Sequence, residues 1–574
     1  MSNLISAVSW VRRGVAQQHP IKYVLDDGEL ERVSKLARIE LEDARKELEK
    51  AHKAAMEMGK GDEEDDDEEE SEVVGMDADG KDDEGEWVDE DSDAMDVDSG
   101  PNDASKKPSK PKNPDDLTEY NLDNYDEEEG GEIGGVFSSI KGLTYYKDNN
   151  EDPYITLKED PEDDEREELE VLPTDNLIVT AKTEDEISQL EIYVYDESQE
   201  NLYVHHDLML PNFPLCLEWL DYHPASSSTN SHPTPATEFG NYIAVGTLDP
   251  EIEIWSLDIV EAMYPATVLG RPDKTKAHVP VPLGTGKKKK KKMKERQKDD
   301  KCHVDAVLGL SWNKQIRNML ASASADRTVK LWDLSRDPVA GGEGAGAIRS
   351  FDVHKDKVQA VQWNTTEPSV LLTGSYDRTV RTFDSRSPDT GVGAAVGSDV
   401  EALRWDPWDS YGFYVSLENG MVLNYDARTL PSNLETPSAA RFTLAAHDGA
   451  ASSLDVNPHL KGCIVTGGTD KLVKVWNVTE DDSNGKRQVS LVTSRDLGVG
   501  KVFSTVWSPD DPLTLAAAGS KAKLQLWDVG SNYGARKAFS AKLKDAGKVL
   551  KEKAESGGVV GVVSDGEESD NDDD

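Results

Sequence analysis

Cysteine is scarce in this sequence: Cys216, Cys302 and Cys463 are the only three in 574 residues, and none lies in a Cys-x-x-Cys pair. This scarcity argues against a disulfide framework and a cysteine zinc site, and it is typical of a reducing compartment. Long apolar runs are missing too, both the roughly 18 residues that a membrane helix needs and the apolar core of a secretory signal. We therefore expect a soluble intracellular protein that makes no contact with a membrane.

Motifs for phosphate binding, metal binding and catalysis are absent as well. The segment GTGK at 284–287 lacks the first glycine of a phosphate-binding loop, and Lys288 stands where that loop needs serine or threonine. The sequence contains no HExxH motif and no calcium-binding loop. These absences predict a protein that is not an enzyme and that has no cofactor, no metal site and no small-molecule substrate.

Basic residues are outnumbered, with 64 lysines and arginines against 113 acidic residues and a formal net charge of −49. Two low-complexity segments concentrate the acids: residues 62–98 contain 22 acids and one lysine, and residues 564–574 contain seven acids and no base. Such segments bury too little apolar surface to offset their chain entropy. We predict a disordered acidic linker over 59–114, an extended lead-in over 115–153, and a short basic helix with an acidic tail over 541–574.

One repeated motif organises the rest of the chain: a β-rich run, a tight turn at Asp326, and a second run that closes on Trp332. Two looser copies close on Tyr195 and Trp255. The spacing between successive closing aromatics is close to the roughly 40 to 45 residues of a four-stranded propeller blade. The sequence therefore predicts an all-β fold, a seven-bladed WD-repeat β-propeller over residues 154–540. The closing aromatics of the last five copies stand at 332, 383, 425, 476 and 527.

A second series of bulky residues supports this prediction. A tryptophan stands 20 residues before four of the closing aromatics, and a valine takes its place before the fifth. Bulky residues at matched heights in neighbouring blades would fill the wedge between them. We therefore assign both series to core packing rather than to ligand binding. The members of the second series are Trp312, Trp363, Trp405, Val456 and Trp507.

A propeller must close its ring, because closure removes the exposed sheet edge. In each blade, three inner strands should end at the closing aromatic, and the outer strand should come from the residues that follow. Residues 154–158 (YITLK) precede the first blade and are predicted to supply the outer strand of the last blade. Residues 537–541 are the rival candidate for that strand.

Three blades contain a histidine, a serine or threonine, an aspartate and the closing aromatic at matching spacing. One such set would resemble a hydrolase triad, but a nucleophile is needed only once. Repetition indicates instead a hydrogen-bond network that ties strands together, and it should be shorter where Phe383 offers no ring N–H. The sets are His303, Ser322, Asp326 and Trp332; His354, Thr373, Asp377 and Phe383; and His447, Thr466, Asp470 and Trp476.

Residues 1–58 precede the acidic linker and contain one amphipathic pattern. From 28 to 58 apolar residues recur every three or four positions, which places them on one face of a helix. We predict that residues 1–58 dock on another protein, because the linker frees the helix from the propeller. The alternative is a helix that folds back on its own propeller. The docking face comprises Leu30, Val33, Ala37, Leu41, Ala44 and Leu48.

A basic insertion, residues 271–301, interrupts the repeats before the third blade. By repeat position it opens on the rim that carries the aspartate turns, and further cations are expected to make that rim locally positive. Three interpretations remain open: nuclear import or nucleolar retention, contact with RNA phosphates, and a solvated loop. The basic residues of the insertion are Lys287, Lys288, Lys289, Lys290, Lys291, Lys292, Lys294 and Arg296, and those of the rim are Arg327, Arg378, Lys471, Lys521, Lys355 and Lys357.

Two serines of the acidic tail, Ser564 and Ser569, each have an acid three residues later. This context suits an acidophilic kinase, and phosphorylation would add charge to an anionic segment. The alternative is an unmodified solubilising tail.

Three segments carry a resemblance to a known family: SAVSWVRRG (6–14), KYVLDDGELERV (22–33) and PTDNLIVTAKTEDEISQLEIYVYDE (173–197). Together with the spaced tryptophans and the acidic linker, they resemble the periodic tryptophan protein 1 family over nearly the whole chain. The resemblance implies a non-enzymatic scaffold of the nucleus and nucleolus, monomeric within a large particle. In ribosome biogenesis it would hold precursor ribosomal RNA and assembly factors of the large ribosomal subunit. A nuclear adaptor for chromatin or histones is the alternative, since acidic segments also suit basic partners.

Overall fold

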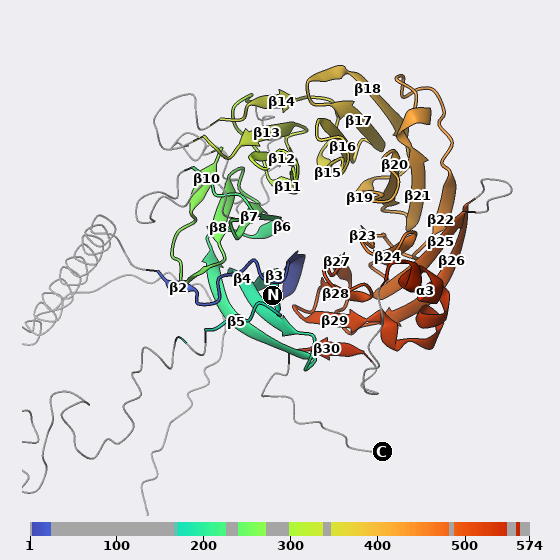
Figure 1. Cartoon of the computed structure of the whole chain (residues 1–574). Helices are drawn as coiled ribbons and strands as arrows, with labels where there is room; N and C mark the ends of the chain where they lie inside the picture. Colours follow the sequence, from blue (N-terminus) through green and yellow to red (C-terminus); the bar gives the residue numbers. More distant parts are fainter. Residues whose placement is uncertain are drawn as a thin grey trace, which may run out of the picture. The chain divides into compact units, whose positions relative to one another are not determined.

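Seven four-stranded antiparallel sheets stand around a central axis as the blades of a propeller (Figure 1). The computed structural model describes residues 3–23, 166, 169–225, 239–270, 298–336, 346–480, 487–547 and 558–562. All of these blades belong to one compact unit, Met1–Leu25 with Asp160–Asp574. The predicted fold, an all-β seven-bladed WD-repeat propeller, is therefore confirmed.

In every blade the strands follow one another outward from the axis in chain order. The first three blades are β1 (Leu4–Val11), β3 (Asn176–Glu184), β4 (Ile187–Asp196) and β5 (Asn201–Leu210); β6 (Pro214–Leu220), β7 (Tyr242–Thr247), β8 (Ile252–Ser256) and β10 (Thr267–Leu269); and β11 (Val307–Trp312), β12 (Met319–Ser324), β13 (Val329–Asp333) and β14 (Arg349–Phe351).

The last four blades are β15 (Val358–Trp363), β16 (Val370–Ser375), β17 (Thr379–Asp384) and β18 (Ser387–Ala395); β19 (Val400–Trp405), β20 (Gly412–Leu417), β21 (Met421–Asp426) and β22 (Phe442–Ala445); β23 (Ser453–Val456), β24 (Cys463–Gly467), β25 (Leu472–Glu480) and β26 (Arg487–Asp496); and β27 (Val502–Trp507), β28 (Thr514–Gly519), β29 (Leu524–Asp528) and β30 (Val559–Gly561). A short parallel pair joins β2 (Ile21–Lys22) to β9 (Ile259–Val260). Single-turn helices η4 (Ala427–Thr429) and η5 (Val529–Ser531) follow β21 and β29.

Strand register explains the two series of bulky residues. In the third blade Trp312 pairs with Leu320, which pairs with Trp332, so both tryptophans stand in one row of the sheet. The second blade repeats this row with Trp219 and Trp255 at its two ends. The members of both series from Trp312 onward are buried. The assignment to core packing is confirmed, and Trp219 joins the inner series although its spacing to Trp255 is longer.

Adjacent blades are also joined by hydrogen bonds near the axis. At four of these joints, the residue before the inner tryptophan or valine presents a polar side chain to the backbone N–H of the next blade's inner tryptophan. Trp312 donates to Glu218 Oε1 at 3.0 Å, and Trp507 donates to Asp455 Oδ2 at 2.9 Å. The same contact joins Trp363 to Ser311 at 3.1 Å. These bonds fix the height of the joined blades against one another.

Ring closure differs from the prediction. The innermost strand of the first blade is β1, which lies beside the last blade (Figure 1). Val8 N–H donates to Ser504 Oγ at 3.3 Å, and Trp10 Nε1 donates to the Val506 carbonyl at 3.2 Å. The outer strand of the last blade is β30. The prediction that residues 154–158 supply this strand is therefore wrong, and those residues lie outside the described part of the chain.

The domain boundaries change accordingly. The predicted propeller limits of 154–540 exclude both β1 and β30, so they are wrong at each end. The predicted docking segment 1–58 is wrong for its first residues, because β1 is part of the propeller core. The pattern of β1 was misleading because Ser6 and Ser9 interrupt its apolar residues, and because its partner β3 begins far along the chain.

Helix α3 (Tyr533–Asp545) lies in the connection between β29 and β30. Asn532 caps its N-terminus, accepting hydrogen bonds from the backbone of Gly534 and Ala535. Ala535, Phe539 and Leu543 are spaced four residues apart and are buried in the core of the last two blades. Residues 537–541 are thus helical, which rules out the rival closing strand, and the predicted basic helix over 541–574 begins earlier, within the propeller.

Candidate functional site

The histidine networks tie together the rim that carries the aspartate turns. In the third blade His303 Nδ1 lies 2.8 Å from Asp326 Oδ2, and its Nε2 lies 2.7 Å from Ser322 Oγ. Trp332 Nε1 donates to the same hydroxyl at 2.8 Å. All four side chains are buried. One proton order satisfies every group: the indole donates to serine, serine to histidine, and histidine to aspartate.

The other two networks follow the same pattern with one difference. His354 contacts Asp377 at 3.1 Å and Thr373 at 2.8 Å, and this chain ends at the threonine because Phe383 cannot donate. In the sixth blade His447 contacts Asp470 and Thr466, and Trp476 Nε1 donates to Thr466 Oγ1 at 2.9 Å. Each network joins the strands of a blade to the turn between them. The networks are structural ties rather than catalytic triads.

Burial sets the protonation of these networks. It lowers the pKa of His303 and His447, so that both rings are neutral near pH 7. Burial opposes ionisation of Asp326, but hydrogen bonds from His303 and Thr328 outweigh it and hold the pKa of that carboxyl well below its usual range. The folded state therefore pairs a neutral imidazole with a carboxylate.

This pairing predicts that stability falls as the pH is lowered below about 6.5, where the unfolded histidine takes up a proton that folded His303 resists. A depressed pKa stabilises the fold above the unfolded value, and that contribution is lost as the pH falls toward the folded value. Urea midpoints measured between pH 7.5 and 5.5 should drop less steeply in His303→Gln, although that variant starts from a lower midpoint. Equal slopes would contradict the prediction.

We call the rim that carries His303, His354 and His447 the histidine rim. The predicted basic residues lie on it, but in three different positions. Arg327, Arg378 and Lys471 follow the turn aspartates and have positive φ angles of 71°, 64° and 70°. Lys521 precedes Ala522, whose φ is 55°, so Lys521 takes the place of the aspartate. Lys355 and Lys357 lie exposed beside His354.

The histidine rim is not uniformly positive. Around the fifth blade Asp399, Glu401 and Glu418 gather, and burial together with these neighbouring carboxylates raises the pKa of Glu401. Arg378 already pairs with Asp399 at 3.2 Å. The expectation of a positive rim is therefore wrong at the fifth blade, where the hairpin of β19 and β20 brings Glu418 beside Asp399 and Glu401, with the Glu418 N–H donating to the Asp399 carbonyl at 3.0 Å.

Positive charge gathers instead in a hollow between the third and fourth blades, which we call the rim hollow. Its volume is about 760 Å³. Its lining includes two of the predicted rim residues, Arg327 and Lys355, together with Lys298, the first described residue of the basic insertion. Lys298 pairs with Asp352 at 2.5 Å. Arg381, which the sequence did not single out, also lines this hollow.

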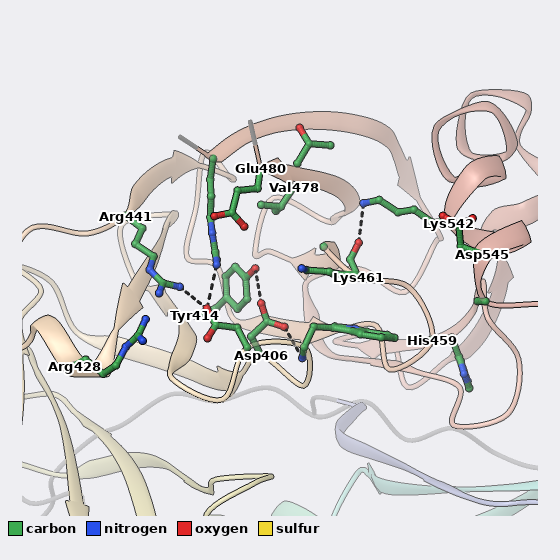
Figure 2. Close-up of a pocket in the computed structure, with 16 residues that line it drawn as sticks. Asp406, Tyr414, Arg428, Arg441, His459, Lys461, Val478, Glu480, Lys542 and Asp545 are labelled. Carbon is green, nitrogen blue, oxygen red and sulfur yellow. Dashed lines mark hydrogen bonds and ion pairs between the residues drawn. The ribbon is translucent and has the colours of Figure 1, made fainter. Parts of the chain in front are cut away.

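A second and larger hollow of about 1120 Å³ lies on the opposite rim, where the first turns of the fifth and sixth blades meet α3 (Figure 2). Its charges largely neutralise one another. Arg441 and Arg487 both pair with Asp409, at 2.6 Å and 3.1 Å, and Arg428 pairs with Asp426 at 2.7 Å. The signal in the sequence was the aromatic turn WDPWDSYG at 405–412, which no other blade has.

Several predicted sites lie outside the described residues. These are the basic residues of the insertion, Lys287, Lys288, Lys289, Lys290, Lys291, Lys292, Lys294 and Arg296; the helix face, Leu30, Val33, Ala37, Leu41, Ala44 and Leu48; and the tail serines, Ser564 and Ser569. The acidic linker also lies outside them.

Within the described ranges, no helix is long and apolar enough to span a membrane. Those same ranges contain no group of three or more histidine, cysteine, aspartate or glutamate side chains that could hold a metal ion.

Residues 295–333, 346–384 and 439–477 match the model of the family described as WD domain, G-beta repeat. An uncharacterized WD repeat-containing protein of Schizosaccharomyces pombe is 39% identical over 95% of this chain and 92% of its own length. Periodic tryptophan protein 1 of Saccharomyces cerevisiae is 35% identical over 96% of this chain and 92% of its own. Its Drosophila melanogaster homolog is 28% identical over 94% and 96%. Because these matches span nearly the whole of each chain, the protein belongs to the periodic tryptophan protein 1 family.

Proposed function

We propose that this protein is a non-enzymatic scaffold in ribosome biogenesis, which holds precursor ribosomal RNA and assembly factors of the large subunit in the nucleolus. Membership of the family carries the proposal, since the resemblance implies this role. The surface is consistent with it. The repeated serine, histidine and aspartate sets are buried ties, whereas the hollows open on the rims, where partners can reach them.

Each part of the chain has a task in this proposal. The closed ring presents two rims at fixed geometry, and the basic insertion 271–301 supplies contacts to RNA phosphates together with nuclear targeting. In this proposal the helix predicted over 28–58 is a tethered second contact, which raises the effective concentration of its partner. Phosphate contacts of this kind bind RNA with steep salt dependence and little sequence preference.

The test follows the tagged full-length protein through a sucrose gradient and maps its RNA crosslinks in the same cells. We expect it to sediment with precursors of the large subunit and to crosslink to precursor ribosomal RNA. Co-purification of histones without such crosslinks would contradict the proposal and favour the chromatin adaptor.

A variant separates targeting from RNA contact. Lys287 to Lys292 are replaced by glutamine, and a separate import signal is attached. We expect nuclear accumulation to be restored while the yield of RNA crosslinks falls. An unchanged yield of RNA crosslinks would mean that the lysine run serves in nuclear targeting alone. The matched control replaces six acids within 62–98 by glutamine, which changes charge to the same extent elsewhere.

A further inference from the structure

The rim hollow is lined by more positive than negative charge. Among its lining residues are four cations, Lys298, Arg327, Lys355 and Arg381, and one carboxylate, Asp352. The ion pair at 2.5 Å between Lys298 and Asp352 already occupies that carboxylate. The lining as a whole therefore favours an anion that enters from solvent.

Arg381 differs from its equivalents in two other blades. It stands on β17, two residues before the closing aromatic, where the third and sixth blades have Lys330 and Lys474. Lys330 Nζ donates to the Asp299 carbonyl at 2.6 Å and to Ser350 Oγ at 2.7 Å. Lys474 Nζ donates to the Ala446 carbonyl at 2.7 Å. In both blades, oxygen atoms of the protein itself accept hydrogen bonds from the lysine ammonium group.

The fourth blade differs, because Arg381 Nε is buried and has no hydrogen-bond partner among the described residues. Strand pairing supplies a reason: Lys330 faces Ser350 on β14, whereas Arg381 faces Gly393 on β18, which has no side chain to accept a hydrogen bond. A Cβ at Gly393 would lie 2.5 Å from the Val380 carbonyl oxygen and 2.8 Å from Leu434 Cδ2, so this strand position admits no larger residue. Gly393 therefore offers Arg381 no acceptor, and unmet buried donors call for a partner.

We propose that the rim hollow binds the phosphorylated side chain of a serine or threonine in a partner protein. A guanidinium presents a planar fork of donors that matches phosphate oxygens, and Lys355 and Arg327 lie in the same hollow to share the charge. Val353 and Pro388 add apolar contacts beside the cations, which suits a peptide.

The recessed position of Arg381 favours a side chain over the backbone of RNA. Arg381 lies on the third strand of its blade, with its Nε buried. A phosphate at the end of a side chain can enter such a recess, whereas the phosphate of an RNA chain is flanked by a ribose on each side. The proposal deepens the proposed function, on which it rests for the kind of partner, an assembly protein.

The experiment uses the purified full-length protein and a fluorescent peptide with one central phosphoserine between aspartates, compared with the same peptide carrying serine. Fluorescence anisotropy should give at least about tenfold tighter binding of the phosphorylated form. Arg381→Gln should remove this difference. Ser432→Glu, a substitution in the lining of the hollow, should remove it as well without disturbing the fold. Lys471→Gln takes one exposed charge from the same rim outside the hollow and should keep the difference.

Equal binding of the two peptides would overturn the proposal, and so would a difference that survives both Arg381→Gln and Ser432→Glu. An oligouridylate that binds the wild type but neither of these variants would make the hollow an RNA site and would also overturn it. If the wild-type protein binds the phosphopeptide but does not sediment with large-subunit precursors in cells, the scaffold function alone is contradicted. The two failures are therefore distinguishable. Thermal melting confirms that each variant is folded.

Discussion

Replacing Trp10 by alanine is expected to lower the free energy of unfolding by about 3 to 5 kcal/mol. Trp10 is 6% exposed, and its indole donates to the Val506 carbonyl of the last blade at 3.2 Å. Its ring also packs edge-on against Tyr195, with centroids 6.3 Å apart. The substitution therefore leaves a cavity and removes a bond at the joint where the first and last blades meet. Urea unfolding followed by far-ultraviolet circular dichroism measures the loss.

The matched control is Trp408→Ala, which removes the same side chain from a site that is 43% exposed. It loses the hydrogen bond from its indole to the Asn457 carbonyl at 3.0 Å, and we expect a cost of about 1 kcal/mol. If both substitutions cost the same, β1 would be a peripheral strand and not the closure of the ring.

Replacing Phe539 by alanine is the second substitution with a large expected effect, again about 3 to 5 kcal/mol. Phe539 is fully buried at the centre of α3, between Ala535 and Leu543, in the core shared by the last two blades. The helix would lose its main buried side chain. The strand β30, which follows the helix, would then be held less firmly against β29. Thermal and urea unfolding of the full chain measure this effect.

Tyr533→Ala serves as its control, because Tyr533 is 76% exposed at the start of the same helix. Its expected change is within about 0.5 kcal/mol. A Phe539→Ala variant as stable as the wild type would show that α3 is an appendage of the propeller.

The blades could be predicted from the sequence wherever their strands are neighbours along the chain. A hairpin such as β12 and β13 brings its own turn, its aspartate and its closing Trp332 within a short stretch, so spacing alone identifies it. The strand β1 has no such local signal, because its partner β3 begins at Asn176 and only the three-dimensional fold joins them. Trp219 was missed for a related reason, since a long connection separates β6 from β7.

The same distinction applies to the candidate sites. The histidine networks lie within single blades, at repeated spacings, and were predicted correctly as structural ties. Both hollows lie between blades, so the residues that line them come from segments with no fixed spacing. Arg381 illustrates this: in the sequence it matches Lys330 and Lys474, and only the contacts of the folded chain distinguish it from them.

Closure by β1 has a consequence for the time order of folding. The bond between Trp10 and Val506 joins residues 496 positions apart, so during synthesis the first strand waits until nearly all of the propeller has left the ribosome. Contacts so distant in sequence are slow to form, and the apolar face of β1 that packs on the last blade is exposed to aggregation in the meantime, although the strand already pairs with β3. Chaperone capture of nascent chains should therefore concentrate on this strand and end only when the last blade emerges.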